Sequence, residues 1–256
     1  MSDASDLAES TPLPKALTRA VALLTDPPAE PDASGGYLNL LGPSANLPER
    51  NNGQVQQLWA SELGSQLYDI AQGLARRLIT AWQLQLDWLN LPAGGVAIDV
   101  GSGPGNVTAA LARATGPDGL ALGVDISEPM LARAVAAEAS ANVGFVRADA
   151  QRLPFRDEVA DAVVSMAALQ LIPDTTAALT QMVRVLRPGG RLAVMVPTSS
   201  GGPLLRLRDL VPDSLGVRFF DGDEIADTLL DAGLSKVKIH QRGVVQWVRG
   251  TKPPNI

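Results

Sequence analysis

The sequence predicts an α/β protein with a doubly wound, Rossmann-like sheet that is mostly parallel. After Pro92, short apolar runs typical of buried strands alternate with amphipathic helical stretches, the pattern of right-handed βαβ units around a parallel sheet. The last two apolar runs are separated by only Gln241, Arg242 and Gly243, which permits a hairpin and is too short for a parallel crossover. We therefore expect a seven-stranded sheet ending in an antiparallel edge strand, with a helical N-terminal cap.

Apolar periodicity places the elements along the chain. The expected strands are Val96–Val100, Leu120–Asp125, Val143–Ala148, Asp161–Ser165, Arg191–Val196 and the two final runs, 234–240 and 244–250. The expected helices are Asn106–Ala114, Glu128–Glu138, Asp174–Leu186 and Glu224–Asp231.

The chain divides into three segments. Residues 1–35 are rich in Pro, Ala, Asp and Ser and are expected to be a flexible N-terminal segment, in which Leu13 to Leu24 can form a short amphipathic helix. Residues 36–91 are expected to form the helical cap, because their apolar side chains fall on one helix face until Pro92 ends the pattern. Residues 92–256 form the sheet domain.

Composition narrows the class of protein. The 256 residues are 46% apolar and 19% charged, which is ordinary for a globular protein. Without cysteine and with one histidine, His240, the chain offers little for a disulfide scaffold, a catalytic triad or a metal site, so no metal is expected. A net charge of −6 and an isoelectric point near 4.8 argue against nucleic acid as a partner. The polar start and short apolar runs predict a soluble, cytoplasmic protein with no membrane span.

A glycine-rich turn follows the first strand of the sheet domain, in VAIDVGSGPGN (96–106). Gly101, Gly103 and Gly105 allow a tight turn and the close approach of a ligand, because they carry no Cβ. The next strand ends in Asp125, where a carboxylate can accept both hydroxyls of a ribose. This arrangement predicts a nucleoside-bearing cofactor, although an ordinary glycine-rich turn is an alternative. The spacing G-x-G-x-G differs from the G-x-G-x-x-G of dinucleotide folds, which disfavours a nicotinamide cofactor.

AIDVGSGPG resembles the first motif of class I S-adenosylmethionine-dependent methyltransferases, whose pattern is acidic-x-G-x-G-x-G. Three more segments resemble that family in the same order: FVRADAQRLPF, DAVVSMAALQLIPD and RVLRPGGRLAV. The resemblance is greatest to the branch that methylates quinones and small molecules. It implies S-adenosylmethionine as cofactor, with the Asp149 carboxylate accepting from the adenine amine and the Ala150 N–H facing a ring nitrogen. A turn-forming role is the alternative for Asp149.

The resemblance and the glycine turn together define the expected cofactor site. Its residues are Asp99, Gly101, Ser102, Gly103, Gly105, Asp125, Ile126, Asp149, Ala150 and Met166. For Asp99, orienting the glycine loop or the cofactor's amino group and a purely structural role are both open.

The segment after the fourth strand departs from the family. Related sequences often carry histidine there, whereas this chain reads Leu169-Gln170-Leu171-Ile172-Pro173-Asp174. The Gln170 amide can orient an acceptor but cannot take its proton at neutral pH. His240 alternates with apolar residues on a terminal strand and is expected to be an exposed edge residue without a catalytic role. Acceptor contacts are expected from Gln170, from Tyr68 in the helical cap and from Leu204 in an apolar lid segment. Core packing is the alternative for Tyr68, and a plain packing helix is the alternative for the lid segment.

These features predict an enzyme that transfers a methyl group from S-adenosylmethionine to a small or medium-sized, partly apolar acceptor, mainly by positioning the reactants for in-line displacement. Methylation at oxygen, carbon or nitrogen and the oligomeric state stay open. The alternative is a protein with the methyltransferase fold that binds the cofactor or a metabolite without turnover.

Overall fold

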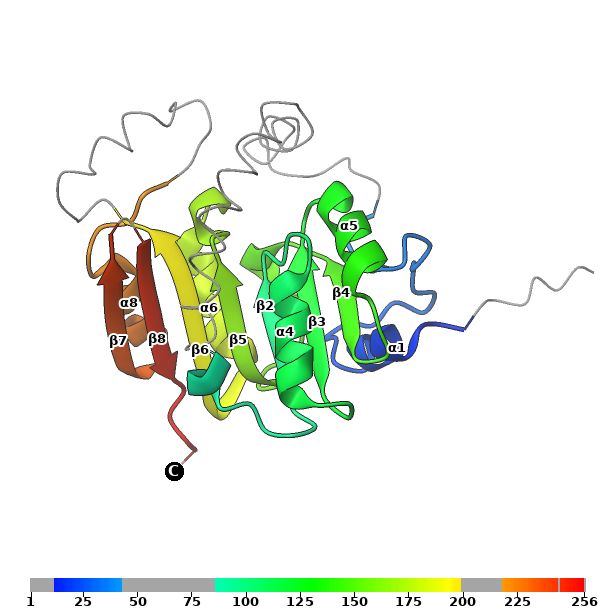
Figure 1. Ribbon diagram of the computed structural model, residues 1–256, viewed down its shortest axis with the longest axis horizontal. Helices are drawn as coiled ribbons and strands as arrows, with labels where there is room; N and C mark the ends of the chain where they lie inside the picture. Colours follow the sequence, from blue (N-terminus) through cyan, green and yellow to red (C-terminus); the bar gives the residue numbers. More distant parts are fainter. Residues whose placement is uncertain (1–11, 43–85, 199–217, 244, 256) are drawn as a thin grey trace, which may run out of the picture.

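The computed structural model describes residues 12–42, 86–198, 218–243 and 245–255, which build a mixed sheet with helices on both faces (Figure 1). The eight strands lie in the order β1-β4-β3-β2-β5-β6-β8-β7. Their bounds are β1 Leu38–Asn39, β2 Val96–Val100, β3 Leu120–Asp125, β4 Val143–Arg147, β5 Ala160–Met166, β6 Leu186–Pro197, β7 Ser235–Arg242 and β8 Val245–Thr251.

All seven predicted strands are present, and the doubly wound fold is confirmed. The strands from β1 to β6 pair in parallel, whereas β8 pairs antiparallel with both β6 and β7. Two details differ from the prediction. The two-residue strand β1 adds an eighth member beside β4, and β8 lies between β6 and β7, so the antiparallel strand is one position inside the edge.

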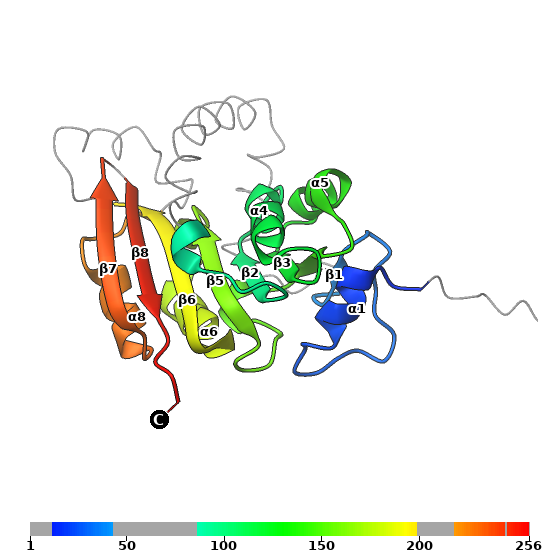
Figure 2. The same ribbon diagram turned by 60° about the horizontal axis from the view of Figure 1, so that its bottom comes forward.

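Helices cover both faces of the sheet, as Figures 1 and 2 show. The helix α4 (Asn106–Thr115) and α5 (Glu128–Glu138) pack on one face, in an apolar cluster that includes Phe145. The other face carries α6 (Thr175–Val185) and α8 (Glu224–Asp231), in a larger cluster that includes Phe155 and Phe220. Each strand of the central sheet is therefore buried on both sides, which explains its near-continuous apolar sequence.

The N-terminal segment makes ordered contacts from residue 12 onward. The short helix expected there is α1 (Lys15–Val21), and its side chains Ala16, Leu17 and Ala20 are buried in the same cluster as α6 and α8. Beyond the helix, the Thr25 N–H donates to the Pro154 carbonyl over 2.9 Å. The apolar side chains of this expected helix fall on one face, with which α1 docks on β3 and β4.

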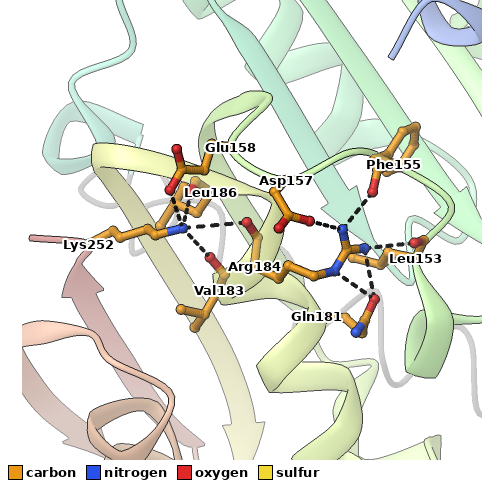
Figure 3. Close-up of polar contacts among 9 residues, drawn as sticks. All are labelled: Leu153, Phe155, Asp157, Glu158, Gln181, Val183, Arg184, Leu186 and Lys252. Carbon is orange, nitrogen blue, oxygen red and sulfur yellow. Dashed lines mark hydrogen bonds and ion pairs between the residues drawn. The ribbon is translucent and has the colours of Figure 1, made fainter. Parts of the chain in front are cut away.

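Charged side chains close the edge of the sheet at which the parallel strands begin, called here the amino edge (Figure 3). The Lys252 ammonium donates to the carbonyls of Val183, Arg184 and Leu186, over 3.3, 3.4 and 2.7 Å. These carbonyls lie at the C-terminal end of α6, where the last turn of a helix lacks backbone partners and favours a cation. Lys252 therefore caps α6 and holds the chain that follows β8.

Arg184 completes the amino edge with a second set of contacts. Its guanidinium donates to the carbonyls of Leu153 and Phe155, over 2.8 and 2.7 Å, and pairs with Asp157 at 2.7 Å. Figure 3 shows these partners arranged around the guanidinium on a loop that precedes β5. The network therefore joins α6, β6 and the connection from β4 to β5.

The end of the helical cap is anchored on the same side of the sheet as α4. Residues 86–89 are helical, and the guanidinium groups of Arg191 and Arg249 both contact the Trp88 ring, with their Cζ atoms 5.3 and 5.0 Å from the ring centroid. Residues 43–85, which hold the rest of the expected cap, lie outside the described residues. In the described part of the chain, no helix combines the length and the apolar character needed to cross a bilayer.

Strand order reverses between β2 and β5, because β3 and β4 lie on one side of β2 while β5 and β6 lie on the other. In open α/β sheets, ligands bind where the carboxyl ends of the strands meet such a reversal. This end of the sheet is called here the carboxyl edge. The topology therefore predicts a ligand-binding site formed by the loops that follow β2, β3 and β5.

Candidate cofactor and active site

The three glycines of the loop after β2 have different tasks. All three adopt left-handed backbone conformations, with φ of 75°, 49° and 87° at Gly101, Gly103 and Gly105. A Cβ at Gly101 would overlap the Ala168 methyl, and one at Gly105 would come within 2.7 Å of the Phe145 ring. A Cβ at Gly103 would meet no protein atom within 4 Å. Gly101 and Gly105 are thus required for packing, whereas Gly103 faces open space that a ligand can use.

Asp125 connects the end of β3 to the glycine loop. Its carboxylate accepts from the Gly103 N–H over 2.8 Å and from the Ser127 N–H over 2.9 Å. Burial raises the pKa of Asp125, while the hydrogen bonds from Ser127, Gly103 and Ile126 lower it. Since a carboxylate offers about four acceptor positions, these contacts leave it acceptor capacity for a ligand. The predicted ribose-binding group therefore also fixes the loop on which the cofactor would lie.

Asp99 lies at the carboxyl end of β2 and is 1% exposed. The Thr108 hydroxyl, from α4, donates to its Oδ2 over 2.7 Å. Burial raises the pKa of Asp99 to about 7, with a further increase from the nearby Asp125, against the lowering effect of Thr108. Asp99 therefore ties the first turn of α4 to β2.

Asp149 forms the turn that follows β4. It is the N-cap of the short 3-10 helix η2 (Ala150–Arg152), accepting from the Gln151 N–H over 2.9 Å. The Gln151 amide nitrogen lies 3.0 and 3.1 Å from the two carboxylate oxygens, and its Oε1 accepts from the Asp174 N–H over 3.0 Å. Asp149 thus fixes this turn, and Gln151 links it to the start of α6.

The loop after β5 approaches the glycine loop. Met166 ends β5 and is partly buried, and Ala167 follows in a left-handed conformation with φ of 54°. The 3-10 helix η3 (Leu169–Leu171) comes next, and the Gln170 amide nitrogen donates to the Ala167 carbonyl over 2.6 Å. The Gln170 Oε1 is buried and has no hydrogen-bond partner within the described residues. This oxygen is therefore an unused acceptor at the strand-order reversal.

Buried oxygens without partners concentrate at the carboxyl edge. Four such side-chain atoms occur among the described residues: Ser102 Oγ, Ser165 Oγ, Gln170 Oε1 and Gln246 Oε1. Ser102 belongs to the glycine loop, Ser165 precedes the last residue of β5, and Gln246 pairs with Val196 near the end of β6. Buried polar groups of proteins are normally hydrogen-bonded, so this concentration indicates a region built to meet a ligand.

Arg147 at the end of β4 was missed by the sequence reasoning. It is 2% exposed, and its guanidinium contacts Gly42, Glu128 and Ile126. An arginine on a strand gives no sequence signal for burial, because this residue type is mostly exposed. The pairing of Arg147 with Asp125 becomes visible only when β3 and β4 are aligned in register.

The remaining candidates are placed as follows. His240 is exposed on the edge strand β7, as expected. β7 lies three strands from β5, about 14 Å at the usual spacing of roughly 4.8 Å. Tyr68 and Leu204 lie outside the described residues. In the described ranges, no group of three or more His, Cys, Asp or Glu side chains is arranged to hold a metal ion.

This geometry defines a class of protein: a doubly wound α/β fold, in which ligands typically bind at the carboxyl edge of the sheet. Residues 98–194 match the methyltransferase domain family. Over 213 residues, the chain is 30% identical to the ubiquinone/menaquinone biosynthesis C-methyltransferase UbiE of Ectopseudomonas mendocina, with 72% of this chain and 82% of that protein covered. The chain belongs to the class I S-adenosylmethionine-dependent methyltransferases, in the quinone methyltransferase-like branch.

Solved structures agree on the fold. The complex between the Haloferax volcanii Trm112 methyltransferase activator and a methyltransferase matches with a TM-score of 0.63 and 21% identity, covering 78% of this chain and 98% of that one. A phosphoethanolamine N-methyltransferase of Haemonchus contortus, solved with S-adenosylhomocysteine, matches with a TM-score of 0.59 and 17% identity, covering 68% and 52%. The protein is an S-adenosylmethionine-dependent methyltransferase, and relatives in this branch act on small molecules such as quinones.

Proposed function

We propose that this enzyme methylates a ring carbon of a hydroxylated aromatic acceptor of the quinol type that carries an apolar substituent. The relatives named as C-methyltransferases of ubiquinone and menaquinone biosynthesis support this acceptor class. The observation that carries the proposal is the buried Oε1 of Gln170 in the loop after β5, which has no partner among the described residues, at the place where related sequences often have histidine. An amide oxygen accepts a hydrogen bond from a phenolic hydroxyl without removing its proton.

The proposed cofactor contacts follow the sequence motifs and fit the described geometry. Gly103 leaves open space for the ligand, and Asp125 keeps acceptor capacity for the ribose hydroxyls. Asp149 would accept from the adenine amine and the Ala150 N–H would face the ring, while Met166 would line the pocket at the end of β5. Backbone atoms complete this set of cofactor contacts, from Gly101, Ser102, Gly105 and Ile126. Asp99 would act indirectly, because it accepts from the Thr108 hydroxyl and so holds the start of α4.

The chemistry requires alignment more than proton transfer. S-adenosylmethionine, when bound, supplies an electrophilic methyl group on a sulfonium. As the acceptor carbon bonds to the methyl carbon, the bond between methyl and sulfur breaks, and its electron pair stays with the sulfur. Hydroxyl oxygens on the acceptor ring make the ring carbon electron-rich, and the ring proton displaced by the methyl group passes to water. Holding the reactants in line is worth up to about 7–11 kcal/mol of barrier reduction. Gln170 would contribute by fixing the hydroxyl and hence the ring.

The test is methyl transfer from cofactor labelled at the methyl group, using a hydroquinone with a short apolar tail. A matched acceptor with both hydroxyls methylated serves as control, together with an amine of similar size. We expect label on a ring carbon of the hydroquinone, identified by NMR of the product, and no label in either control. Label on oxygen or nitrogen would reject carbon methylation. S-adenosylhomocysteine binding without turnover of any acceptor tested would reject the quinol-type acceptor.

A further inference from the structure

Arg147 is a buried cation that joins three separate segments at the rim of the carboxyl edge. Its Nη1 lies 2.7 Å from the Gly42 carbonyl, 2.9 Å from the Glu128 carboxylate and 3.3 Å from the Asn39 Oδ1. Its Nε donates to the Ile126 carbonyl over 3.3 Å. The guanidinium therefore contacts the N-terminal segment, the start of α5 and the loop after β3 at once.

Burial of this charge is costly. The Arg147 side chain is 2% exposed, whereas its acidic partner Glu128 is 50% exposed. Removing an ion from water costs several kcal/mol, and a well-packed apolar side chain is often at least as stabilising. Packing alone therefore does not explain an arginine at this position. An arginine is explained instead by its hydrogen bonds, because a guanidinium can donate in several fixed directions to partners on separate segments.

A single peptide unit connects Arg147 to Asp125. The carbonyl of Ile126 accepts from Arg147, and the N–H of the same peptide unit, on Ser127, donates to Asp125 Oδ1 over 2.9 Å. Because a peptide unit is planar, fixing the direction of its carbonyl also fixes the direction of its N–H. Arg147 thereby sets the orientation of the Asp125 carboxylate, whose other oxygen holds Gly103 of the glycine loop.

The N-terminal segment is the other end of this connection. The Leu40 N–H donates to the Arg147 carbonyl over 3.1 Å, and Asn39 is the register partner of Arg147 in the pairing of β1 with β4. Backbone and side chain of Arg147 therefore both hold residues 39–42. A displacement of this segment removes contacts to the guanidinium and frees the Ile126–Ser127 peptide unit to turn.

We propose that Arg147 is a positioning residue that makes cofactor binding depend on the docking of residues 39–42. It acts through the Ile126–Ser127 peptide unit on Asp125 and does not touch the cofactor. This inference rests on the proposed placement of the cofactor against Asp125. Coupling between two sites is reciprocal, so cofactor binding must in turn stabilise the docked segment.

A double-mutant cycle tests the connection, with S-adenosylhomocysteine affinity measured by calorimetry on the full chain. We expect Arg147→Gln to weaken binding about tenfold, within the usual range of coupling between sites. Asp125→Asn is expected to weaken it about ten- to hundredfold, as for hydrogen bonds to a charged group. The double variant should bind no more than about threefold more weakly than Asp125→Asn alone, because residues of one network are not additive.

Arg184→Gln is the matched control, since Arg184 also holds several carbonyls but at the amino edge. It should lower thermal stability and leave affinity unchanged in both backgrounds. If Arg147→Gln does not fold by circular dichroism, Arg147→Lys takes its place in the cycle, because lysine keeps the charge but cannot reach Gly42 and Ile126 together. Fully additive losses would overturn the role of Arg147. An unchanged affinity in Asp125→Asn would overturn the placement of the cofactor instead.

Hydrogen exchange gives the reciprocal measurement. The Leu40 amide should exchange more slowly in the wild-type protein when S-adenosylhomocysteine is bound, and this protection should be lost in Arg147→Gln at saturating ligand. Protection of Leu40 that is the same with and without ligand in the wild-type protein would contradict the coupling.

Discussion

The two edges of the sheet differ in whether their polar side chains have hydrogen-bond partners within the described residues. At the amino edge, Lys252 and Arg184 find carbonyl and carboxylate partners on every side, so that α6, β6 and the last residues of the chain are joined (Figure 3). At the carboxyl edge, the four buried oxygens without partners lie at or near strand ends. The comparison indicates that one edge serves stability, while the other keeps unsatisfied groups and tight turns for a ligand.

The largest effect is expected at Gly101. Gly101→Ala places a side chain in a left-handed conformation, at a cost of about 1–2 kcal/mol, and overlaps the Ala168 methyl, which adds about 1–3 kcal/mol. Calorimetry should show at least a hundredfold loss of S-adenosylhomocysteine affinity. Gly189→Ala is the control, since Gly189 has φ of 78° with nothing within 4 Å of a Cβ. Equal losses of affinity in both variants would contradict the comparison.

Asp99 should give the carboxyl edge a pH-dependent stability. Its pKa of about 7 in the folded state exceeds the ordinary value of 3.8, so the folded protein binds more protons between these values. The free energy of unfolding should therefore fall as pH rises from 4 to 7 and level off above, by on the order of 2–4 kcal/mol for this group.

Asp99→Asn removes this titration. From pH 4 to 7, the free energy of unfolding of the wild-type protein should fall relative to that of the variant, because all other groups contribute to both curves. Urea unfolding at several pH values from 4 to 8 measures this difference. Parallel curves for the two proteins would show that Asp99 is ionised normally in the folded state.

Asp125→Ala separates binding from folding at the carboxyl edge. The carboxylate is expected to accept from the ribose, so its removal should weaken S-adenosylmethionine binding by about 1.5–3 kcal/mol. Calorimetry with S-adenosylmethionine measures this, and NADH should not bind to either protein. An unchanged affinity would remove Asp125 from the site.

Lys252→Met should affect stability alone. Loss of a partly buried ammonium leaves the carbonyls of Val183, Arg184 and Leu186 without their donor, at a cost of about 2 kcal/mol. For a protein of this size, that loss should lower Tm by roughly 4–8 °C. Cofactor affinity and kcat/KM, measured below the transition, should not change. A loss of affinity at this distant edge would show that the two edges are coupled.

The smallest effects concern the acceptor. Gln170→Ala should lower kcat/KM about tenfold, or 1.4 kcal/mol, if its Oε1 orients the hydroxyl. His240→Gln, on the exposed edge strand, should stay within about threefold of the wild-type value. The kcat/KM values of both variants are measured in the same assay, with the acceptor that the labelling experiment identifies. A hundredfold loss in His240→Gln with intact cofactor affinity would overturn catalysis without a histidine.

The sequence by itself determined the architecture. Alternating apolar runs predicted the strands to within a few residues, and the bounds of α5 and α8 were predicted as observed. Asp174 caps α6 by accepting from the Ala177 N–H over 2.8 Å. The glycine turn and Asp125 indicated a nucleoside-bearing cofactor. These signals are local, since periodicity, caps and turns depend on residues that are close in the chain.

Only the tertiary structure decided which polar groups are buried and what they hold. Arg147 meets Gly42, 105 residues earlier in the chain, and no local pattern marks either residue. No local sequence pattern marks the docking of α1, the insertion of β8 between β6 and β7, or the use of Asp99 to anchor α4 either. The physical reason is that burial of a charge depends on partners brought together by the fold, whereas a strand or helix depends on the spacing of its own side chains.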